Sequence, residues 1–197
     1  MFVKAPDFNL DLTVHSGQPP QFIMDYGPGW ASFVYGNSLV AVRQKEGGER
    51  LEIETRGKKI DEGKLAEHIS LIFRLDDDMP YIRKRISTDA HMKKLLAEFP
   101  GMRLTLNEPW ETLACFVCSQ NNSRRNIRNS VQLLMKNFGE KIEIGGKIYY
   151  KFPAPEDITA GCCRDLRKCK VGFRAEYLMN AAKFAQGGIM AELQTMS

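Results

Sequence analysis

The hydrophobic pattern of this chain changes once, near residue 60, and that change limits the folds open to it. Before this point, β-prone runs at residues 30–35, 39–43 and 51–55 are separated by turn residues, mostly glycines. Apolar residues also alternate with polar ones over Phe8–Val14, which is the period of a half-buried strand. The first sixty residues therefore predict an antiparallel meander.

From residue 61 onward the apolar residues recur with the spacing of amphipathic helices. Asp61 is placed to cap the first helix, Pro109 fits the first position of a later one, and Gly139 fits the end of another. A hairpin is expected over Lys141–Tyr150. The apolar faces predicted for the helices span Leu65–Phe73, Met79–Ile86, Met92–Phe99, Trp110–Val117, Ile127–Phe138 and Arg174–Phe184.

The order of these elements predicts an α+β fold, with an antiparallel sheet domain first and a helical domain second. The chain has 197 residues, which is slightly more than one average domain. We place the sheet and the helices that follow it in a domain over residues 1–106. The helical domain then covers residues 107–197.

The formal net charge of +4 is distributed unevenly along the chain. Residues 1–117 hold 15 basic and 17 acidic side chains, a net of −2, whereas residues 118–175 hold 12 basic and 5 acidic side chains, a net of +7. A polyanion is the natural partner of such a stretch, although a solvated basic face would show the same count.

No apolar run approaches the ~18 residues of a membrane span, and the first residues lack the apolar segment of a signal peptide. The five cysteines are an odd number and include the adjacent Cys162 and Cys163, which argues against a secreted disulfide framework. We therefore expect a protein without a membrane partner that is cytoplasmic and nucleoid-associated, or nuclear in a eukaryotic host.

Cys115 and Cys118 have the two-residue gap of a metal-binding knuckle. A zinc or iron–sulfur site needs four converging ligands, and these two cysteines lie in an apolar helical run, where small buried residues are the simpler interpretation. We expect no metal and no cofactor, with a cysteine-based metal-binding module as the weakest alternative. The three histidines form no Ser–His–Asp or Cys–His set, and no phosphate loop or dinucleotide fingerprint is present.

Two polar runs stand out within the basic stretch. Ser119–Asn126 joins two apolar helices with amides, hydroxyls and two arginines, which suit base edges and phosphates. Arg167–Arg174 places an aromatic residue and an arginine at a helix start behind a basic turn, where an aromatic ring can enter a base stack. A capped helix–helix loop and a buried Phe173 are the plain structural alternatives.

Several motifs occur in one order along the chain: Ser16–Gln18, Gly101–Leu104, Pro109–Leu113, Phe116–Asn122, Phe138–Gly139, Tyr149–Pro153, Leu166–Lys168 and Val171–Tyr177. In this order they resemble the 8-oxoguanine DNA glycosylase family of the helix-hairpin-helix superfamily. The resemblance covers roughly Phe8 to the last residue. It is carried by the whole ordered set and not by any one motif.

This resemblance implies an antiparallel N-terminal sheet domain on a helical glycosylase domain. It also implies that the protein excises 8-oxoguanine from duplex DNA after flipping the base out, and that it nicks the abasic site, as most members do. In the family a lysine amine forms a Schiff base with the sugar and an aspartate assists. The implied partner is double-stranded DNA containing oxidised guanine, bound by a monomer.

The resemblance also assigns binding residues. Gly17 matches the glycine whose carbonyl accepts the N7 hydrogen of 8-oxoguanine, and Asn121 matches the asparagine that fills the gap left by the flipped base. Phe173 matches an aromatic wedge that is usually tyrosine, and Arg174 matches the arginine that contacts the orphaned cytosine. A second family arginine falls on Asn126, so that Arg124 or Arg125 would have to substitute for it. The surrounding DNA-binding residues are Asn122, Arg124, Arg125, Asn126 and Lys170.

The family's hairpin motif, the catalytic lysine that follows it and the downstream aspartate are not found within residues 1–197. The resemblance therefore implies an incomplete helical glycosylase domain and no catalytic residue in this chain. We expect these 197 residues alone to be inactive. Two other functions stay open: a non-catalytic damaged-DNA-binding protein, and a glycosylase for alkylated purines in which Gly17 would read no lesion.

Overall fold

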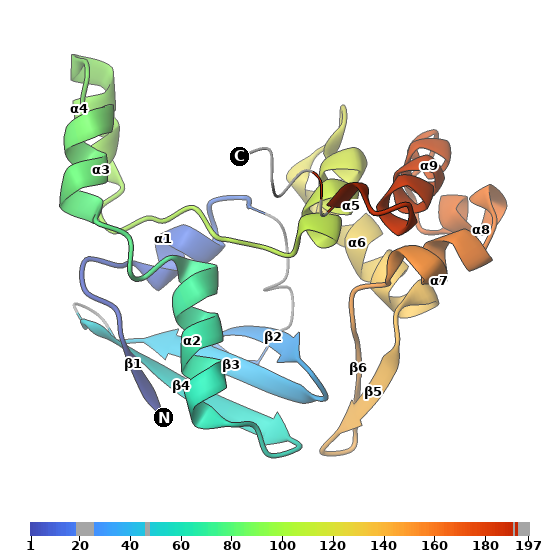
Figure 1. The fold of residues 1–197 in the computed structure, drawn as a ribbon, viewed down its shortest axis with the longest axis horizontal. Helices are drawn as coiled ribbons and strands as arrows, with labels where there is room; N and C mark the ends of the chain where they lie inside the picture. The colour runs from blue at the N-terminus through green and yellow to red at the C-terminus, as the bar shows by residue number, and fades with distance from the viewer. Residues whose placement is uncertain (19–25, 46–47, 191, 193–197) are drawn as a thin grey trace. The chain divides into compact units, whose positions relative to one another are not determined.

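The computed structural model describes residues 1–18, 26–45, 48–190 and 192. These residues form two compact units, of which one ends at Leu106 and the other begins at Asn107 (Figure 1). The first unit combines an antiparallel sheet with helices, and the second combines a helical core with a two-stranded hairpin. Within the described ranges, no helix is both long enough and apolar enough to cross a membrane.

The sheet of the first unit has the strand order β1-β4-β3-β2, and every neighbouring pair is antiparallel. The expected meander is confirmed over β2 (Ala31–Tyr35), β3 (Ser38–Gln44) and β4 (Arg50–Gly57). The short strand β1 (Phe2–Lys4) adds to the edge of β4 and was not predicted.

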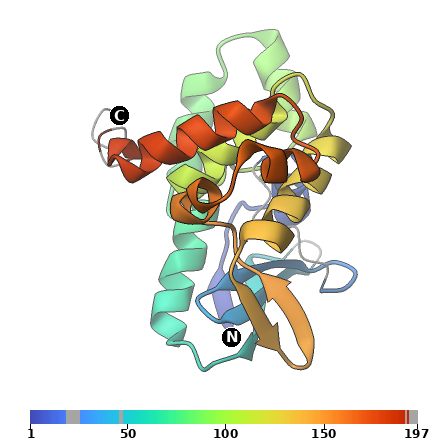
Figure 2. The same ribbon diagram turned by 90° about the vertical axis from the view of Figure 1, so that its right-hand side faces the viewer.

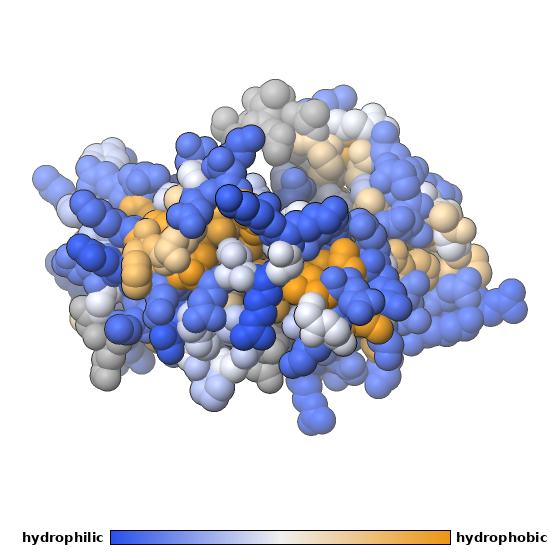
Figure 3. Space-filling model, turned by 90° about the horizontal axis from the view of Figure 1, so that it is seen from below, coloured by the Kyte–Doolittle hydropathy of each residue, from blue (hydrophilic) through white to orange (hydrophobic). Residues whose placement is uncertain are grey.

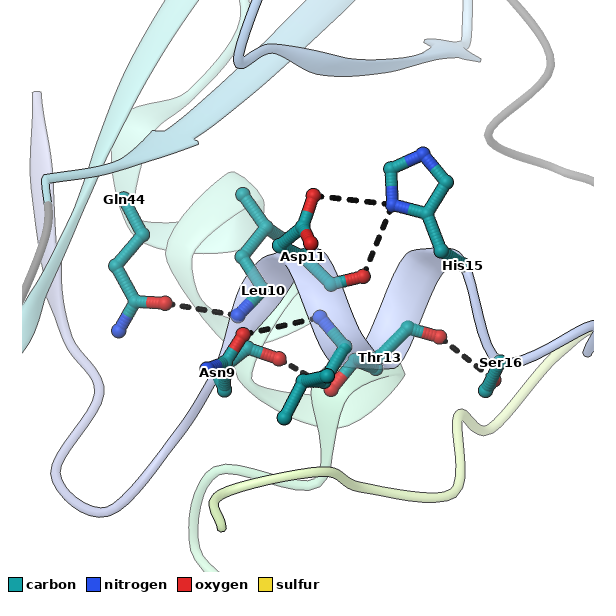
Figure 4. A network of polar contacts seen from close by, with 8 residues as sticks. Asn9, Leu10, Asp11, Thr13, His15, Ser16 and Gln44 are labelled. Atoms are coloured by element: carbon teal, nitrogen blue, oxygen red, sulfur yellow. Dashed lines mark hydrogen bonds and ion pairs between the residues drawn. The ribbon is translucent and has the colours of Figure 1, made fainter. Parts of the chain in front are cut away.

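The strand expected over Phe8–Val14 is wrong, because this segment forms helix α1 (Leu10–Val14) (Figure 4). The Asn9 side chain caps the helix by accepting a hydrogen bond at 2.9 Å from a backbone N–H in its first turn. The buried positions are Leu10 and Thr13, which are three residues apart, as on one face of a helix. The alternation of apolar and polar residues therefore does not reflect burial here.

Helix α2 (Glu62–Phe73) lies along one face of the sheet (Figure 1). Its predicted cap is confirmed, because the Asp61 carboxylate accepts a hydrogen bond from a first-turn backbone N–H at 2.9 Å. The ring of His68 packs 4.4 Å from that of Tyr35 on β2. The helices α3 (Met79–Ile86) and α4 (Ala90–Glu98) follow as predicted. The buried residues of α2 are Leu65, Ile69, Ile72 and Phe73.

The elements of the second unit are α5 (Pro109–Ser119), α6 (Arg124–Phe138), β5 (Lys141–Ile144), β6 (Lys147–Tyr150), α7 (Pro155–Ala160), α8 (Cys163–Lys168) and α9 (Arg174–Gln186). The start of α5 at Pro109, the hairpin and the last helix confirm the sequence predictions.

Helices α5 and α9 pack against each other in the core of the second unit (Figures 1 and 2). Trp110 ties the start of α5 to the end of the hairpin segment, since its indole Nε1 donates a hydrogen bond to the Pro153 carbonyl at 2.8 Å. This packing brings the C-terminal end of α5 close to the start of α9. The core residues include Trp110, Ala114, Val117, Cys118, Leu134, Ile158, Leu166, Val171, Ala175 and Leu178.

Most of the surface seen in Figure 3 is hydrophilic, with hydrophobic patches between the polar side chains. In the second unit, large apolar side chains that are exposed include Phe116, Phe173, Tyr177 and Phe184. Single exposed apolar side chains are common in proteins, so only those that lie beside other candidate site residues are evidence of a binding surface.

Glu111 in the first turn of α5 makes the stability of the second unit depend on pH. Burial raises the pKa of Glu111 from 4.5 to about 7, and the nearby Glu108 carboxylate adds to this effect. The folded chain therefore binds the proton more tightly than the unfolded chain. The free energy of unfolding is highest below pH 4.5 and falls as the pH rises through 7.

We expect Glu111→Gln to remove this dependence, because the amide stays neutral at every pH. Above pH 7 the variant should be more stable than the parent by about 1–2 kcal/mol, with little difference at pH 4.5. Urea denaturation at both pH values measures the effect, and Glu108→Gln is the control on the same turn. Parallel pH profiles of parent and Glu111→Gln would contradict the assignment.

Candidate functional site

The loop between α5 and α6 is a tight turn closed by its own polar groups. Asn121 adopts a left-handed backbone conformation, with φ of 46°. The Asn122 amide donates to the Cys118 carbonyl at 3.1 Å and accepts from the Ser123 backbone N–H at 3.0 Å. The Ser123 hydroxyl caps α6 by accepting from the Asn126 backbone N–H at 3.3 Å. The turn thus engages the amide of Asn122 and leaves Asn121 exposed.

The segment between α8 and α9 is a second turn. Lys170 and Gly172 have φ of 61° and 59°, and Val171 between them is buried. The Ser130 hydroxyl of α6 donates to the Lys170 carbonyl at 3.2 Å. This turn places Phe173 at the N-cap position of α9.

Arg174, the first residue of α9, joins the two turns. Its side chain is buried, with 7% exposure of the residue. Nε donates to the Gln120 carbonyl at 2.7 Å, Nη1 donates to the Val171 carbonyl at 3.2 Å, and Nη2 donates to the Asn121 carbonyl at 2.9 Å and also to that of Gln120. Its guanidinium carbon lies 4.5 Å from the centre of the Phe173 ring. The structure therefore brings Asn121, Phe173 and Arg174 together, as the sequence predicts.

The placement of Arg174 shows that its guanidinium organises the backbone. A guanidinium has five N–H donors, and the guanidinium of Arg174 makes four hydrogen bonds to backbone carbonyls. Two of the acceptors lie just beyond the C-terminal end of α5, where the helix dipole favours a cation. A contact between Arg174 and an orphaned cytosine stays a prediction.

Phe173 is 57% exposed, and its ring meets that of Tyr177 edge-on, with 6.1 Å between ring centres. Tyr177 is itself 53% exposed. The sequence analysis assigned no role to Tyr177, although its position four residues after Phe173 on a helix places both on one face. The two rings form an exposed aromatic surface next to the Arg174 cluster.

Arg124 and Arg125 lie exposed in the first turn of α6, which contains no acidic residue. Cations are unfavourable at a helix N-terminus, and a bound anion offsets that cost. Elsewhere in this unit, Arg167 pairs with Glu176 at 2.8 Å. The position of Arg124 and Arg125 at the N-terminus of α6 makes them candidates for a phosphate contact.

The three buried cysteines of the second unit, Cys115, Cys118 and Cys169, are suited to packing and not to thiolate chemistry. Burial raises the pKa of the Cys118 thiol to about 11, and it also raises the pKa of Cys115 and of Cys169 above the ordinary range. These thiols stay protonated at neutral pH, whereas a metal ligand or nucleophile must be a thiolate. Across the described ranges, no group of three or more potential ligands could hold a metal ion.

Gly17 belongs to the first unit, whereas the other candidate residues belong to the second. It is exposed and has φ of 92°, which is strained for a residue with a side chain. The segment Ser16–Gln18 follows helix α1, and not the strand that the sequence predicted over Phe8–Val14. The Ser16 hydroxyl donates to the Thr13 carbonyl at 2.8 Å and fastens the loop to that helix (Figure 4).

The family model of the 8-oxoguanine DNA glycosylase N-terminal domain matches residues 1–113 of the chain. The chain belongs to the 8-oxoguanine DNA glycosylase family. The N-glycosylase/DNA lyase of Saccharomyces cerevisiae is 35% identical over 150 residues, which is 74% of this chain and 39% of that protein.

Solved structures of family members agree with the fold. MBOgg1, in complex with a low-affinity DNA ligand, superposes with a TM-score of 0.82 and is 30% identical, and the match covers 95% of this chain and 63% of that one. The Clostridium acetobutylicum 8-oxoguanine glycosylase/lyase, in complex with double-stranded DNA containing cytosine opposite 8-oxoguanine, gives 0.78 and 26%, covering 95% and 66%. The chain spans less than two thirds of the length of the yeast and MBOgg1 relatives.

We expect Arg174→Lys to loosen the turn around Asn121. A single ammonium cannot reproduce the forked donation to the Gln120, Asn121 and Val171 carbonyls. The free energy of unfolding should fall by about 1–3 kcal/mol, and the backbone amides of residues 120–123 should exchange hydrogen faster. Denaturation and hydrogen exchange measure the two effects.

The matched control is Arg167→Lys, which conserves charge in an exposed ion pair and should change stability by less than about 0.5 kcal/mol. If the amides of residues 120–123 exchange equally fast in the parent and in Arg174→Lys, Arg174 does not hold the turn.

Proposed function

We propose that this chain carries the lesion-recognising part of a base-excision repair DNA glycosylase and abasic-site lyase. The whole protein would flip 8-oxoguanine out of duplex DNA and excise it. The observation that carries this proposal is the cluster in which one buried arginine, Arg174, holds both Asn121 and Phe173 at the surface. Family membership supports it, and so do relatives named N-glycosylase/DNA lyase.

The cluster suits a duplex in which one base has been flipped out of the stack. Asn121 is exposed on a left-handed turn whose carbonyl is anchored, so its amide can enter the gap and exchange hydrogen bonds with the orphaned base. The exposed face of Phe173 can wedge between adjacent base pairs and stabilise a kink. Arg124, Arg125, Asn126 and Lys170 are exposed in the same unit, where phosphates can offset their charges.

Gly17 supplies the proposed chemistry of lesion recognition. 8-Oxoguanine carries a hydrogen on N7, where guanine has an acceptor lone pair. A backbone carbonyl attracts that N–H and repels the lone pair, so a single well-placed carbonyl favours the damaged base. The exposed Gly17 loop can present such a carbonyl without a side chain in the way.

This proposal assigns recognition to the chain and assigns no covalent step to its residues. The Schiff-base chemistry of the family needs a lysine amine, and none of the lysines within residues 1–197 matches it. We further propose that the protein acts as a monomer without a cofactor, in association with DNA in the cytoplasm or the nucleus.

The test records binding and borohydride trapping in parallel on an 8-oxoguanine duplex and on an undamaged duplex. We expect residues 1–197 to bind the damaged duplex more tightly and to give no covalent adduct. An adduct would show that a lysine of this chain is the nucleophile and would overturn the assignment of roles. Tighter binding of a 3-methyladenine duplex would instead favour a glycosylase for alkylated purines.

We expect Phe173→Ala to weaken binding of the 8-oxoguanine duplex by about 1–3 kcal/mol, because the stacking face is lost. Fluorescence anisotropy titration measures the change. Phe184→Ala is the control, since Phe184 is a similarly exposed phenylalanine on α9, eleven residues further along the chain. Equal effects of the two substitutions would place the wedge elsewhere.

We expect Arg124→Ala and Arg125→Ala each to reduce the salt dependence of DNA binding. A cation that contacts a phosphate releases about one counterion, so the slope of log K against log salt should fall by about 1 per residue. The loss should be equal for damaged and undamaged duplexes. Lys183→Ala, in the last turn of α9, is the control, and an unchanged slope in both arginine variants would move the phosphate contacts to other residues.

A further inference from the structure

The Gln18 carboxamide is the most highly bonded side chain beside the Gly17 loop. Its Nε2 donates to the Ser16 hydroxyl and to the Arg103 carbonyl, each at 2.8 Å, and more weakly to the Thr13 carbonyl at 3.3 Å. Its Oε1 accepts from the Thr105 backbone N–H at 2.5 Å and from the Thr105 hydroxyl at 3.0 Å. The amide thus links the loop to the distant segment 103–105.

The orientation of this amide follows from its partners. Two of the groups facing Nε2 are backbone carbonyls, which only accept, and one of the groups facing Oε1 is a backbone N–H, which only donates. A flipped amide would lose these bonds and set like groups against each other. The interaction therefore requires both ends of a carboxamide.

Segment 103–105 is itself a fixed anchor. Arg103 is 4% exposed, and its guanidinium donates to the carbonyls of Arg74 at 3.0 Å and of Pro6 and Asp7 at 3.3 Å each. Its backbone N–H donates to the Thr13 hydroxyl at 3.2 Å. A loop fastened to this segment is held against the core of the first unit.

Gly17 lies between two fastened residues and remains exposed. The Ser16 hydroxyl is bonded to α1, and the Gln18 side chain is bonded to segment 103–105, so the peptide groups on both sides of Gly17 are restrained. Within the described ranges, no residue donates a hydrogen bond to the Gly17 carbonyl. The loop thus combines an exposed glycine with a restrained backbone.

We infer that Gln18 is a positioning residue that sets how well the Gly17 carbonyl distinguishes 8-oxoguanine from guanine. This inference rests on the proposed function, which gives the Gly17 carbonyl its role. The two bases differ at N7 by the presence of one hydrogen, so discrimination depends on the direction of one carbonyl. A carbonyl that can rotate away from guanine N7 no longer repels it, and preference is lost even where affinity survives.

The test compares binding of an 8-oxoguanine duplex, a guanine duplex and a duplex with an abasic-site analogue. For Gln18→Ala and for Gln18→Glu, we expect the preference for 8-oxoguanine over guanine to fall about three- to tenfold. Affinity for the abasic analogue should stay within about twofold, because that duplex presents no base to Gly17. The carboxylate of Gln18→Glu keeps the shape of the side chain but cannot donate to the two carbonyls.

Gln44 offers a matched control in the same unit. Its Oε1 accepts from the Leu10 backbone N–H at 2.8 Å (Figure 4), and its Nε2 donates to the carbonyls of Phe8 at 2.7 Å and Gly48 at 2.8 Å. Gln44→Ala removes a comparable set of bonds without touching the Gly17 loop. It should lower thermal stability and leave the preference for 8-oxoguanine unchanged.

A milder variant, Thr105→Val, keeps the backbone donor and removes the hydroxyl bond to Gln18. It should reduce the preference in the same direction by a smaller factor, and it covers the case in which Gln18→Ala does not fold. Hydrogen exchange of the Gly17 and Gln18 amides should accelerate in all of the Gln18 and Thr105 variants.

The outcomes separate the two claims. If the parent prefers 8-oxoguanine and the Gln18 variants keep that preference, Gln18 does not position Gly17, while the proposed function stands. If Gln44→Ala lowers the preference as much as Gln18→Ala, general stability explains the effect and the inference is overturned. If the parent shows no preference, the proposed function is overturned, and this inference with it.

Discussion

The arrangement of the two turns in the second unit depends on one buried cation, the guanidinium of Arg174. The Arg174 guanidinium is removed from water and bonded to the carbonyls of Gln120, Asn121 and Val171. Burying a cation is costly unless hydrogen bonds replace its hydration, and four carbonyl contacts provide that replacement here. Because the acceptors belong to the turn after α5 and to the turn before α9, the same charge fixes both turns. The exposed positions of Asn121 and Phe173 follow from it.

The first unit uses the same physical device around a different residue. Arg103 is buried, and its side chain donates to three carbonyls, including those of Asp7 and Arg74, two residues with left-handed backbones. Gln18 extends this network to the loop that contains Gly17. In both units an exposed residue with positive φ lies beside a side chain that makes several hydrogen bonds to backbone groups. Such an arrangement exposes a residue to the solvent and keeps its backbone from relaxing.

The electrostatic character of the second unit suits the binding of a polyanion. Its buried thiols are held in the neutral form by raised pKa values, and the exposed Arg124 and Arg125 lie at the N-terminus of α6 without an acidic residue in that turn. Neutral thiols are poor nucleophiles, whereas exposed cations favour a polyanion. These properties agree with the relatives, which are named for glycosylase and lyase action on DNA.

The sequence by itself determined the elements whose signals are local. Strands β2–β4, the cap at Asp61, the start of α5 at Pro109 and the hairpin β5–β6 all depend on residues a few positions apart. Local pattern was misleading at α1, where the alternation of residues 8–14 also fits a short capped helix. The tertiary structure alone decided the distant partners of Arg174 and Gln18. Gln120 lies 54 residues from Arg174 in the chain, and Thr105 lies 87 residues from Gln18. No periodicity encodes such pairs, because they form only when packing brings distant carbonyls within reach of a buried donor.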